Sequence, residues 1–292
     1  MRKLVIYTAF VLMVSCKKEI AVNIVDRPVM LVVNADLLCD SFVEINLSMT
    51  QKITDNTGQK KVDDAVIEVF SKDTTILDVL TSQGNGVYKS AVVKPRAAKN
   101  YLFKISQQNK VYWIDEMMPD TFDLNIVDTS RVIFQGQNNF FQFRLDLSND
   151  VFKDNFFSFR LKKISKKVQG TDTILVEEWS DISSVDFILT ENSQSRFSKK
   201  HLLFTDQYFR GSKQEFKFGT SLSDKTNLKT VKLILFVSSH SESGYNFYTS
   251  VNEHLFYQND PFSQPTLLKG NVPNAYGAAV GQITKVFEVQ FK

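Results

Sequence analysis

Cysteine is scarce in this chain: only Cys16 and Cys39 occur among 292 residues. Cys16 lies close behind an N-terminal apolar run, and if its thiol is modified there, Cys39 has no partner for an intramolecular disulfide. The sequence therefore predicts a protein that is stabilised by packing alone. Cys39 follows Leu37 and Leu38 and is interpreted as a small buried hydrophobe.

An excess of charge of either sign is also lacking. The chain has 35 basic and 32 acidic residues, for a net charge of +3, and the two signs are interspersed along it. Nucleic-acid binding depends on a strongly basic surface, so no nucleic-acid partner is expected. After the N-terminus, no apolar run approaches the ~20 residues that a helix needs to cross a bilayer.

Residues with the spacing of a metal or cofactor site are not found. The chain has three histidines, His201, His240 and His254, and none is spaced with another histidine or cysteine as in a metal site. The pattern H-E-x-x-H and the glycine-rich phosphate-binding patterns G-x-G-x-x-G and G-x-x-x-x-G-K-[ST] are absent. We expect no bound metal and no cofactor.

Catalytic arrangements are equally poor. Ser239 adjoins His240, but neighbours on a strand point to opposite faces, and the G-x-S-x-G elbow is missing. The acidic pairs Asp63–Asp64, Asp115–Glu116 and Glu177–Glu178 are interpreted as solvated turns. The sequence therefore predicts a protein that is not an enzyme.

The N-terminus is the most informative stretch that is present. Arg2 and Lys3 precede the apolar run Leu4–Val14, and Ser15 precedes Cys16. A run of this length is typical of a secretory signal. The segment Leu-Met-Val-Ser-Cys resembles a bacterial lipobox, which implies cleavage before Cys16 and lipidation of its thiol. Residues 1–15 would be a lipoprotein signal peptide and residues 16–27 a lipidated tether; the alternative is an ordinary signal peptide with a chance cysteine.

The residues behind Cys16 bear on location. Lys17-Lys18-Glu19 resembles the surface-export signal of Bacteroidota lipoproteins. This resemblance implies an outer-membrane protein, held by lipid and facing the cell exterior.

Residues 28–120 show strands at a spacing of 8–12 residues, joined by Gly, Asn and Asp turns, as in an all-β sandwich. Pro119 ends the series, because proline cannot donate to a ladder. The order DAVIEVF, GNGVYKS, YLFKI, YWIDEMMP resembles immunoglobulin-like and transthyretin-like modules of bacterial surface proteins.

Residues 121–292 repeat the β-pattern in a larger sandwich. Strands are predicted at Phe140–Leu147, Phe156–Ile164, Thr173–Trp179, Ser183–Leu189, Thr230–Ser238 and Ile283–Phe291, with Thr230–Ser238 central. Residues 244–258 break this pattern, because Tyr245, Tyr248 and Leu255 recur at helical spacing, and Ser243 is available as a cap. We expect two β-sandwich domains, the second with one short helix.

The whole mature chain resembles a family. The segments SCKKEI, MLVVNADL, LLFTDQYFRGS and NDPFSQPTLLKGNVPNAYGAAVG follow the order seen in Bacteroidota outer-membrane lipoproteins that are defined only as a domain of unknown function. Their genes tend to lie beside those of TonB-dependent receptors. The resemblance implies a non-enzymatic accessory or binding subunit of an outer-membrane transport or assembly complex, with an outer-membrane β-barrel as partner. The alternative is a stand-alone surface binder of glycan or peptide ligands.

Aromatic residues near the predicted helix are the candidate interaction surface, because aromatic side chains are enriched at interface hot spots. The alternative is that they cap the end of the second sandwich. The candidate residues are Tyr245, Tyr248, Tyr257, Phe262 and Tyr276.

Overall fold

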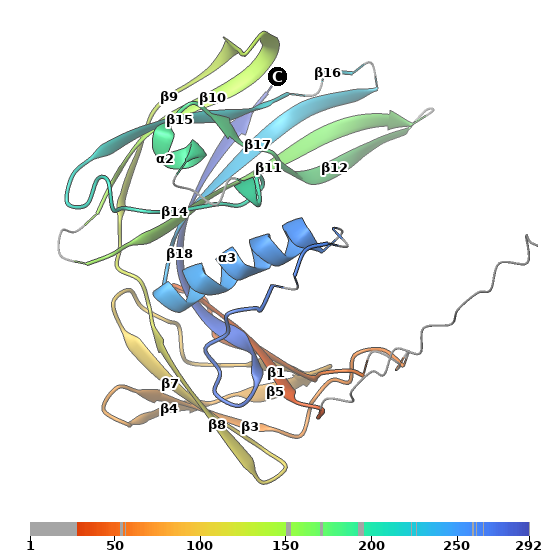
Figure 1. Ribbon diagram of the computed structural model, residues 1–292, viewed down its shortest axis with the longest axis vertical. Coiled ribbons are helices and arrows are strands. Elements are labelled where there is room, and N and C mark those ends of the chain that lie inside the picture. The colour runs from red at the N-terminus through yellow and green to blue at the C-terminus, as the bar shows by residue number, and fades with distance from the viewer. Residues whose placement is uncertain are drawn as a thin grey trace, which may run out of the picture.

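The structure is a computed structural model, and it describes residues 28–52, 55, 57–149, 153–169, 172–191, 196–222, 224–225, 227–258, 260, 262–264 and 266–291. The predicted signal peptide, the tether and the lipidation site Cys16 lie outside these residues. Within them the chain is mostly strand, arranged as one ten-stranded sheet and two four-stranded sheets (Figure 1). The prediction of an all-β, sandwich-like fold with a short helix is confirmed.

The first unit packs one half of the long sheet against a four-stranded sheet. The long sheet contributes β1 (Leu31–Leu38), β2 (Glu44–Met49), β6 (Val87–Lys89) and β5 (Thr81–Gly84). The opposing sheet has the order β4 (Ile76–Val79), β3 (Val66–Ser71), β7 (Asn100–Gln107) and β8 (Lys110–Met117). Its core is mainly aliphatic, because every second residue of β1, from Leu31 to Leu37, is turned inward and buried.

The second unit packs the other half of the long sheet against the remaining four-stranded sheet. The long sheet contributes β12 (Asp172–Ser180), β11 (Phe156–Gln169), β17 (Leu228–His240) and β18 (Tyr276–Gln290), with β14 (Leu202–Thr205) and β16 (Asp224–Lys225) beside it. The opposing order is β13 (Ser183–Ser184), β15 (Gln214–Ser221), β10 (Gln137–Ser148) and β9 (Asp123–Phe134). Alternating residues such as Phe141, Phe143 and Leu145 form a core rich in phenylalanine.

A single strand, β18, belongs to both units. Its first half runs parallel to β1, with Val32 opposite Tyr276 and Leu38 opposite Gln282. Its second half runs antiparallel to β17, from His240 opposite Gln282 to Lys232 opposite Gln290. The sequence predicted a closing strand only from Ile283. The small residues before it are strand residues whose size permits the close approach to β1.

One predicted strand was wrong. Of Ser183–Leu189, only Ser183–Ser184 is extended, and a helical turn, α2 (Phe187–Thr190), follows. The side chain of Asp186 caps this turn by accepting a hydrogen bond from the Ile188 backbone N–H at 2.9 Å. Asp186 therefore favours a helix start over continuation of the ladder.

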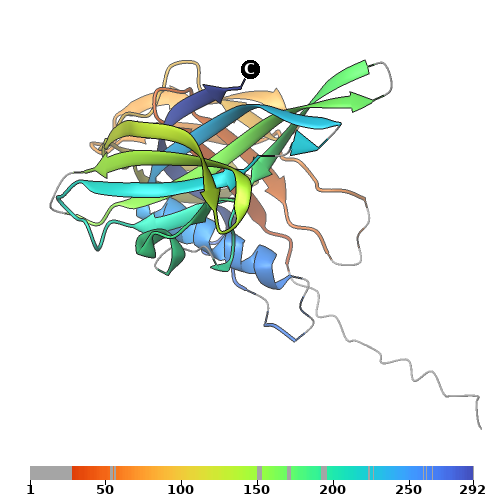
Figure 2. The same cartoon turned by 90° about the horizontal axis from the view of Figure 1, so that it is seen from above.

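The helix α3 (Glu242–Tyr257) lies across the outer face of the long sheet, between the two units (Figures 1 and 2). Its N-cap is Ser241, which accepts a hydrogen bond from the Gly244 N–H at 3.1 Å. The cap predicted at Ser243 was wrong, because the hydroxyl of Ser243 donates to the carboxylate of Glu116 on β8. No helix among the described residues is long and apolar enough to cross a bilayer.

Candidate functional site

The five aromatic candidates do not share one surface. Tyr245 stacks on Phe156, with ring centroids 4.8 Å apart. Tyr248 packs beneath α3 against His201 and His240, at 5.2 and 5.4 Å. The other three are solvent-exposed: Tyr257 is the last residue of α3, Phe262 lies in the loop after it, and Tyr276 begins β18.

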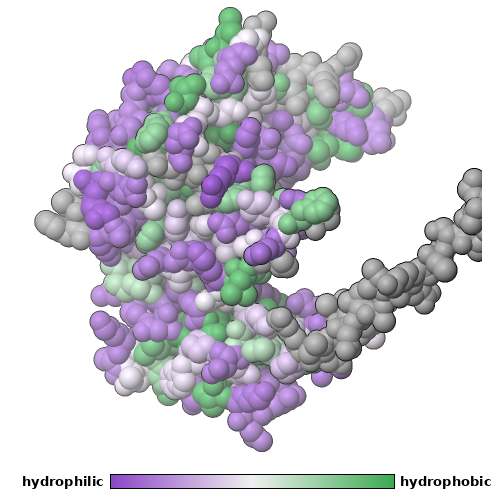
Figure 3. Space-filling view, viewed as in Figure 1, coloured by the Kyte–Doolittle hydropathy of each residue, from purple (hydrophilic) through white to green (hydrophobic). Residues whose placement is uncertain are grey.

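The C-terminal end of α3 and the loop after it form one exposed apolar projection, here called the α3 tip. Phe262 is 94% exposed and Leu267 is 80% exposed. Figure 3 shows apolar side chains gathered where the end of α3 projects from the molecule. The members of the α3 tip are Leu255, Phe256, Tyr257, Phe262, Leu267 and Leu268, which are all exposed.

A second exposed apolar surface lies on the outer side of the sheet β4-β3-β7-β8, and it is here called the apolar sheet face. Trp113 on β8 is 49% exposed, and its ring lies 5.7 Å from that of Phe70. Opposite Trp113 stands Lys104, whose ammonium is 2.6 Å from the Glu68 carboxylate. The apolar members of this face are Val66, Phe70, Ile76, Val79, Leu102, Val111, Trp113 and Met117.

Sequence reasoning missed the apolar sheet face, although β8 carries a signal for it. Val111 and Trp113 alternate with Tyr112 and Ile114, so both sides of the strand are apolar. Tyr112 and Ile114 are buried in the first core, which leaves Val111 and Trp113 on the outside. An antiparallel strand with one wet face normally alternates apolar and polar residues. The apolar residues on the second face are therefore the sequence signal for this exposed patch.

His201 and His240 form a buried cluster, whereas His254 is exposed. Nε2 of His240 is 2.7 Å from the hydroxyl of Ser158 rather than bonded to Ser239. Burial, with Arg160 nearby, lowers the pKa of His240 to about 3. Burial and the neighbouring His240 hold the pKa of His201 well below its ordinary value. A Ser–His pair acts as nucleophile and base when a third group orients the histidine, and within the described chain Nδ1 of His240 has no partner.

The surroundings of this cluster do not suit a metal ion. Within the described part of the chain, no group of three or more His, Cys, Asp or Glu side chains could hold one. Tyr248 completes the cluster beneath α3, and burial raises its pKa to about 12. The two neutral imidazoles form a polar floor beneath α3, and Tyr248 of the helix packs on it.

Glu116 occupies the joint between the two units, and its interpretation as part of a solvated turn was wrong. It lies on β8 and is 2% exposed. Its carboxylate accepts hydrogen bonds from the Ser243 hydroxyl at 2.6 and 2.7 Å, from the Asn271 amide at 2.8 Å and from the Gly281 N–H at 2.8 Å. Burial raises the pKa of Glu116, although these donors favour the charged form. The first unit is thereby bonded to α3 and β18.

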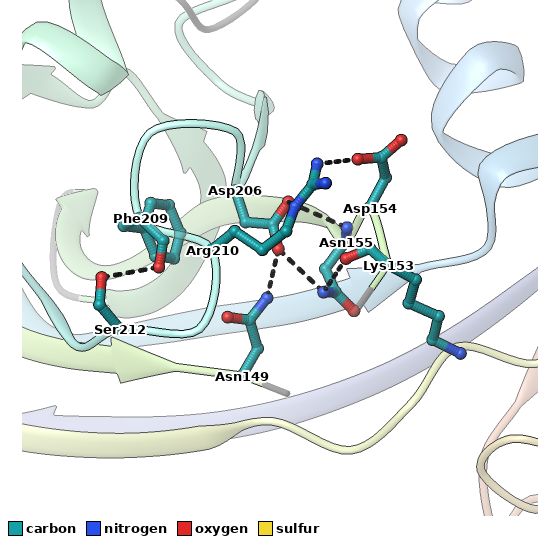
Figure 4. A network of polar contacts seen from close by, with 8 residues as sticks. All are labelled: Asn149, Lys153, Asp154, Asn155, Asp206, Phe209, Arg210 and Ser212. Carbon is teal, nitrogen blue, oxygen red and sulfur yellow. Dashed lines mark hydrogen bonds and ion pairs between the residues drawn. The ribbon is translucent and has the colours of Figure 1, made fainter. Parts of the chain in front are cut away.

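Asp206 is a second buried carboxylate, and it organises the segment LLFTDQYFRGS (Figure 4). Its two oxygens accept hydrogen bonds from the Asn155 N–H at 3.1 Å, the Asn155 amide at 2.8 Å and the Asn149 amide at 2.6 Å. Arg210 lies 3.8 Å from the same carboxylate and also contacts Asp154. These bonds join the connection between β10 and β11 to the connection between β14 and β15, so Asp206 has a structural role.

The comparisons with known proteins identify a family and no activity. Among proteins of curated function, none matches the sequence of this chain. A trypsin-activated alpha-2-macroglobulin from Escherichia coli is similar in structure at 10% sequence identity and a TM-score of 0.23, over 76% of this chain and 15% of that one. The chain thus spans a small part of that protein, and a TM-score this low supports no argument. The model of a domain of unknown function, DUF4249, matches residues 17–284, so the chain belongs to this family.

Proposed function

We propose that the protein is a non-enzymatic lipoprotein of the outer membrane, anchored through Cys16 and facing the cell exterior. It acts as an accessory or binding subunit of an outer-membrane complex, and its partner is a β-barrel protein such as a TonB-dependent receptor. The observation that carries this proposal is the apolar sheet face, which suits a protein partner.

The apolar sheet face has the composition of an interface core. Large exposed apolar patches are uncommon on monomers and mark sites of association. Val79, Glu68, Lys104 and Trp113 lie opposite one another across the four strands, and Trp113, at the end of this row, is half exposed. Tryptophan is among the residues that contribute most to binding energy at protein interfaces. The Glu68–Lys104 pair lets the face become dry without leaving an isolated charge.

The N-terminus supports the location. The lipobox-like segment before Cys16 implies two or three acyl chains, which suffice for stable anchoring. Eleven residues, 17–27, separate Cys16 from the first described residue, Pro28. A protein on such a tether meets membrane partners in two dimensions, so a face of moderate affinity is enough to keep a complex together.

The test is a native pull-down of the acylated protein from outer membranes in mild detergent, followed by mass spectrometry. Truncation of an interface tryptophan should reduce stoichiometric capture of a barrel by about tenfold or more, so Trp113→Ser is the diagnostic variant. Ile133→Ser is the matched control, because Ile133 is 73% exposed on β9 in the other unit. Capture of no barrel by the unmodified protein, or equal capture by both variants, contradicts the proposal.

A stand-alone surface binder is the second candidate, and one feature favours it. A polar groove of about 430 Å³ opens at the edge of the second unit, lined among others by Trp179, Asp181 and Lys200. An aromatic ring beside polar and charged side chains suits a glycan or peptide ligand. Retention of ligand by the purified protein after removal of the anchor, with no barrel bound, would favour this candidate.

A further inference from the structure

The α3 tip includes the last turn of α3, which extends beyond the sheet on which the helix packs. Tyr245, Tyr248 and Leu255 share one face, because their spacing is helical. The first two contact the second unit through Phe156 and the histidine cluster, whereas Leu255 is 53% exposed. The last turn of α3 therefore extends past the sheet, and the apolar face that is packed at Tyr245 and Tyr248 is exposed at Leu255.

The described residues of the loop after α3 add Phe262 and Leu267 to the same apolar projection. The Ser263 hydroxyl donates to the backbone oxygen of Tyr257 at 3.4 Å, and the Lys269 N–H donates to the Ser250 hydroxyl at 2.9 Å. These bonds connect Ser263 and Lys269 to α3, and Phe262 and Leu267 lie exposed beside them. The result is a convex apolar projection and not a groove.

The tip is flanked by cations. The guanidinium of Arg196 lies 4.3 Å from the ring of Phe197, and that ring contacts Phe256 and Tyr257. The backbone oxygen of His201 accepts a hydrogen bond from the Asn252 amide, which brings the segment before His201 to α3. The exposed cations of these flanking segments are Arg196, Lys199, Lys200 and Lys269, and the acids nearest to the tip in sequence are Glu253 and Asp260.

The α3 tip lies on the same side of the molecule as the start of β1 (Figures 1 and 2). Tyr276, which follows the loop of the tip, is opposite Val32 near the start of β1. Figures 1 and 2 agree that the loop after α3 and the start of β1 lie on one side. The segment from Cys16 to Pro28 spans at most about 40 Å when fully extended, which keeps this side near any membrane that holds Cys16.

We propose that the α3 tip inserts Phe262, Leu267 and the last turn of α3 into the headgroup region of the membrane that holds Cys16. The proposal rests on the lipid anchor of the proposed function. A lipid surface accepts a convex apolar projection, and flanking cations bind its phosphates. The tip then acts as a second attachment that fixes how the protein stands on the bilayer and leaves the apolar sheet face available to a protein.

The test uses the acylated protein reconstituted alone into vesicles of phosphatidylcholine and phosphatidylglycerol. A bimane fluorophore is attached to Leu267→Cys in a Cys39→Ser background, and lipids with a nitroxide near the headgroup serve as quenchers. Ile133→Cys carries the same label as the matched control. We expect a loss of fluorescence at position 267 and none at position 133. Slower hydrogen exchange across 255–268 of the unlabelled protein on addition of vesicles is the second expected result.

Three outcomes overturn the proposal or separate it from the proposed function. Equal fluorescence at positions 267 and 133, with unchanged hydrogen exchange, rejects membrane insertion even if a barrel co-purifies. Iodide, a water-soluble quencher, reports whether the label at position 267 is covered. If the label is protected from iodide only when a co-purified barrel is present, the α3 tip is a protein-docking site, and membrane insertion is again rejected. If the protein does not co-float with the vesicles in a density gradient, the lipid anchor of the proposed function is rejected. Nitroxide quenching at high lipid concentration then still decides whether the α3 tip enters the membrane.

Discussion

The interiors of the two units and the joint between them are held by different forces. The first core is mainly aliphatic, from Leu31 to Ile114, and the second is rich in phenylalanine, from Phe141 to Phe218. The joint instead contains Glu116 with its hydroxyl, amide and backbone donors. Apolar burial is non-directional and stabilises each unit, whereas hydrogen bonds are directional and set how the units are placed.

This difference matters because the two exposed surfaces lie on opposite sides of the joint. The apolar sheet face belongs to the first unit, and the α3 tip belongs to a helix that packs on the second. Glu116 bonds to Ser243 in the first turn of α3, so the joint connects both surfaces directly. A change at the joint should alter their relative placement, whereas a change within one core should weaken only that unit.

The largest expected effect comes from the backbone of the joint. Gly277 has φ of +95°, and a Cβ there would lie 1.9 Å from the backbone oxygen of Val33. Gly277→Ala therefore combines left-handed strain with a clash that only separation of β1 and β18 relieves, and it should cost at least about 3 kcal/mol of unfolding free energy. Urea unfolding, monitored by Trp113 and Trp179, measures this loss.

Gly84→Ala is the control for Gly277→Ala. Gly84 has φ of +83°, but a Cβ added there would meet no atom within 4 Å. It therefore reports the backbone strain alone, about 1 kcal/mol. Equal losses for the two variants would show that the close approach of β18 to β1 does not hold the units together.

The next effect comes from the side chain of the joint. Glu116→Ala removes the acceptor shared by the Asn271 amide, the Gly281 N–H and the Ser243 hydroxyl. Among the described residues, each donor keeps only its second partner, the Ala279 oxygen for Asn271 and the Ser241 hydroxyl for Gly281 and Ser243. The expected loss of unfolding free energy is about 3 kcal/mol. Asp115→Ala, on the same strand but exposed, should cost less than about 1 kcal/mol. Hydrogen exchange should locate the weakening of Glu116→Ala in α3 and β18, and uniform exchange across both units would contradict the role of the joint.

The sandwiches were predictable from local patterns, and the joint was not. Phe141, Phe143 and Leu145 alternate with polar residues, so their strand and its buried side follow from the sequence. The pairing of Val32 with Tyr276 joins residues from opposite ends of the chain, and no local period reports it. The small residues from Gly277 to Gly281 look like a loop until a neighbouring backbone explains their size.

For the buried polar groups, local sequence patterns report which side of an element a residue faces but not its partners. Glu116 follows Tyr112 and Ile114 in the period-two pattern of β8, so parity alone places its carboxylate on the buried side. Its donors come from residues more than a hundred positions away, which parity does not reveal. Tyr245 and Tyr248 share the packed face of α3, and their helical spacing indicates packing as much as recognition.

The smallest expected effect is a pH dependence of the unfolding free energy, which arises from the buried histidines beneath α3 and not from the two apolar cores. In the unfolded chain His240 binds a proton below about pH 6.5, whereas burial lowers its pKa to about 3 in the folded protein. Its stabilising contribution is therefore present above pH 6.5 and is lost as the pH falls toward 3. At pH 5 the loss is about 2 kcal/mol relative to pH 7, and His201, whose pKa is also lowered, acts in the same direction.

Glu116 opposes this trend, because a raised pKa means that its contribution is lost as the pH rises. Between pH 5 and 7, we expect His201 and His240 to determine the pH dependence of the unfolding free energy, with Glu116 as the smaller opposing contribution. Urea unfolding across that range should give a shallower slope for His240→Gln, whereas His254→Gln, which removes an exposed histidine, should retain the slope of the unmodified protein. Glu116→Gln should instead steepen the slope, because it removes the opposing contribution. An unchanged slope in His240→Gln would show that the histidine cluster beneath α3 does not cause the pH dependence.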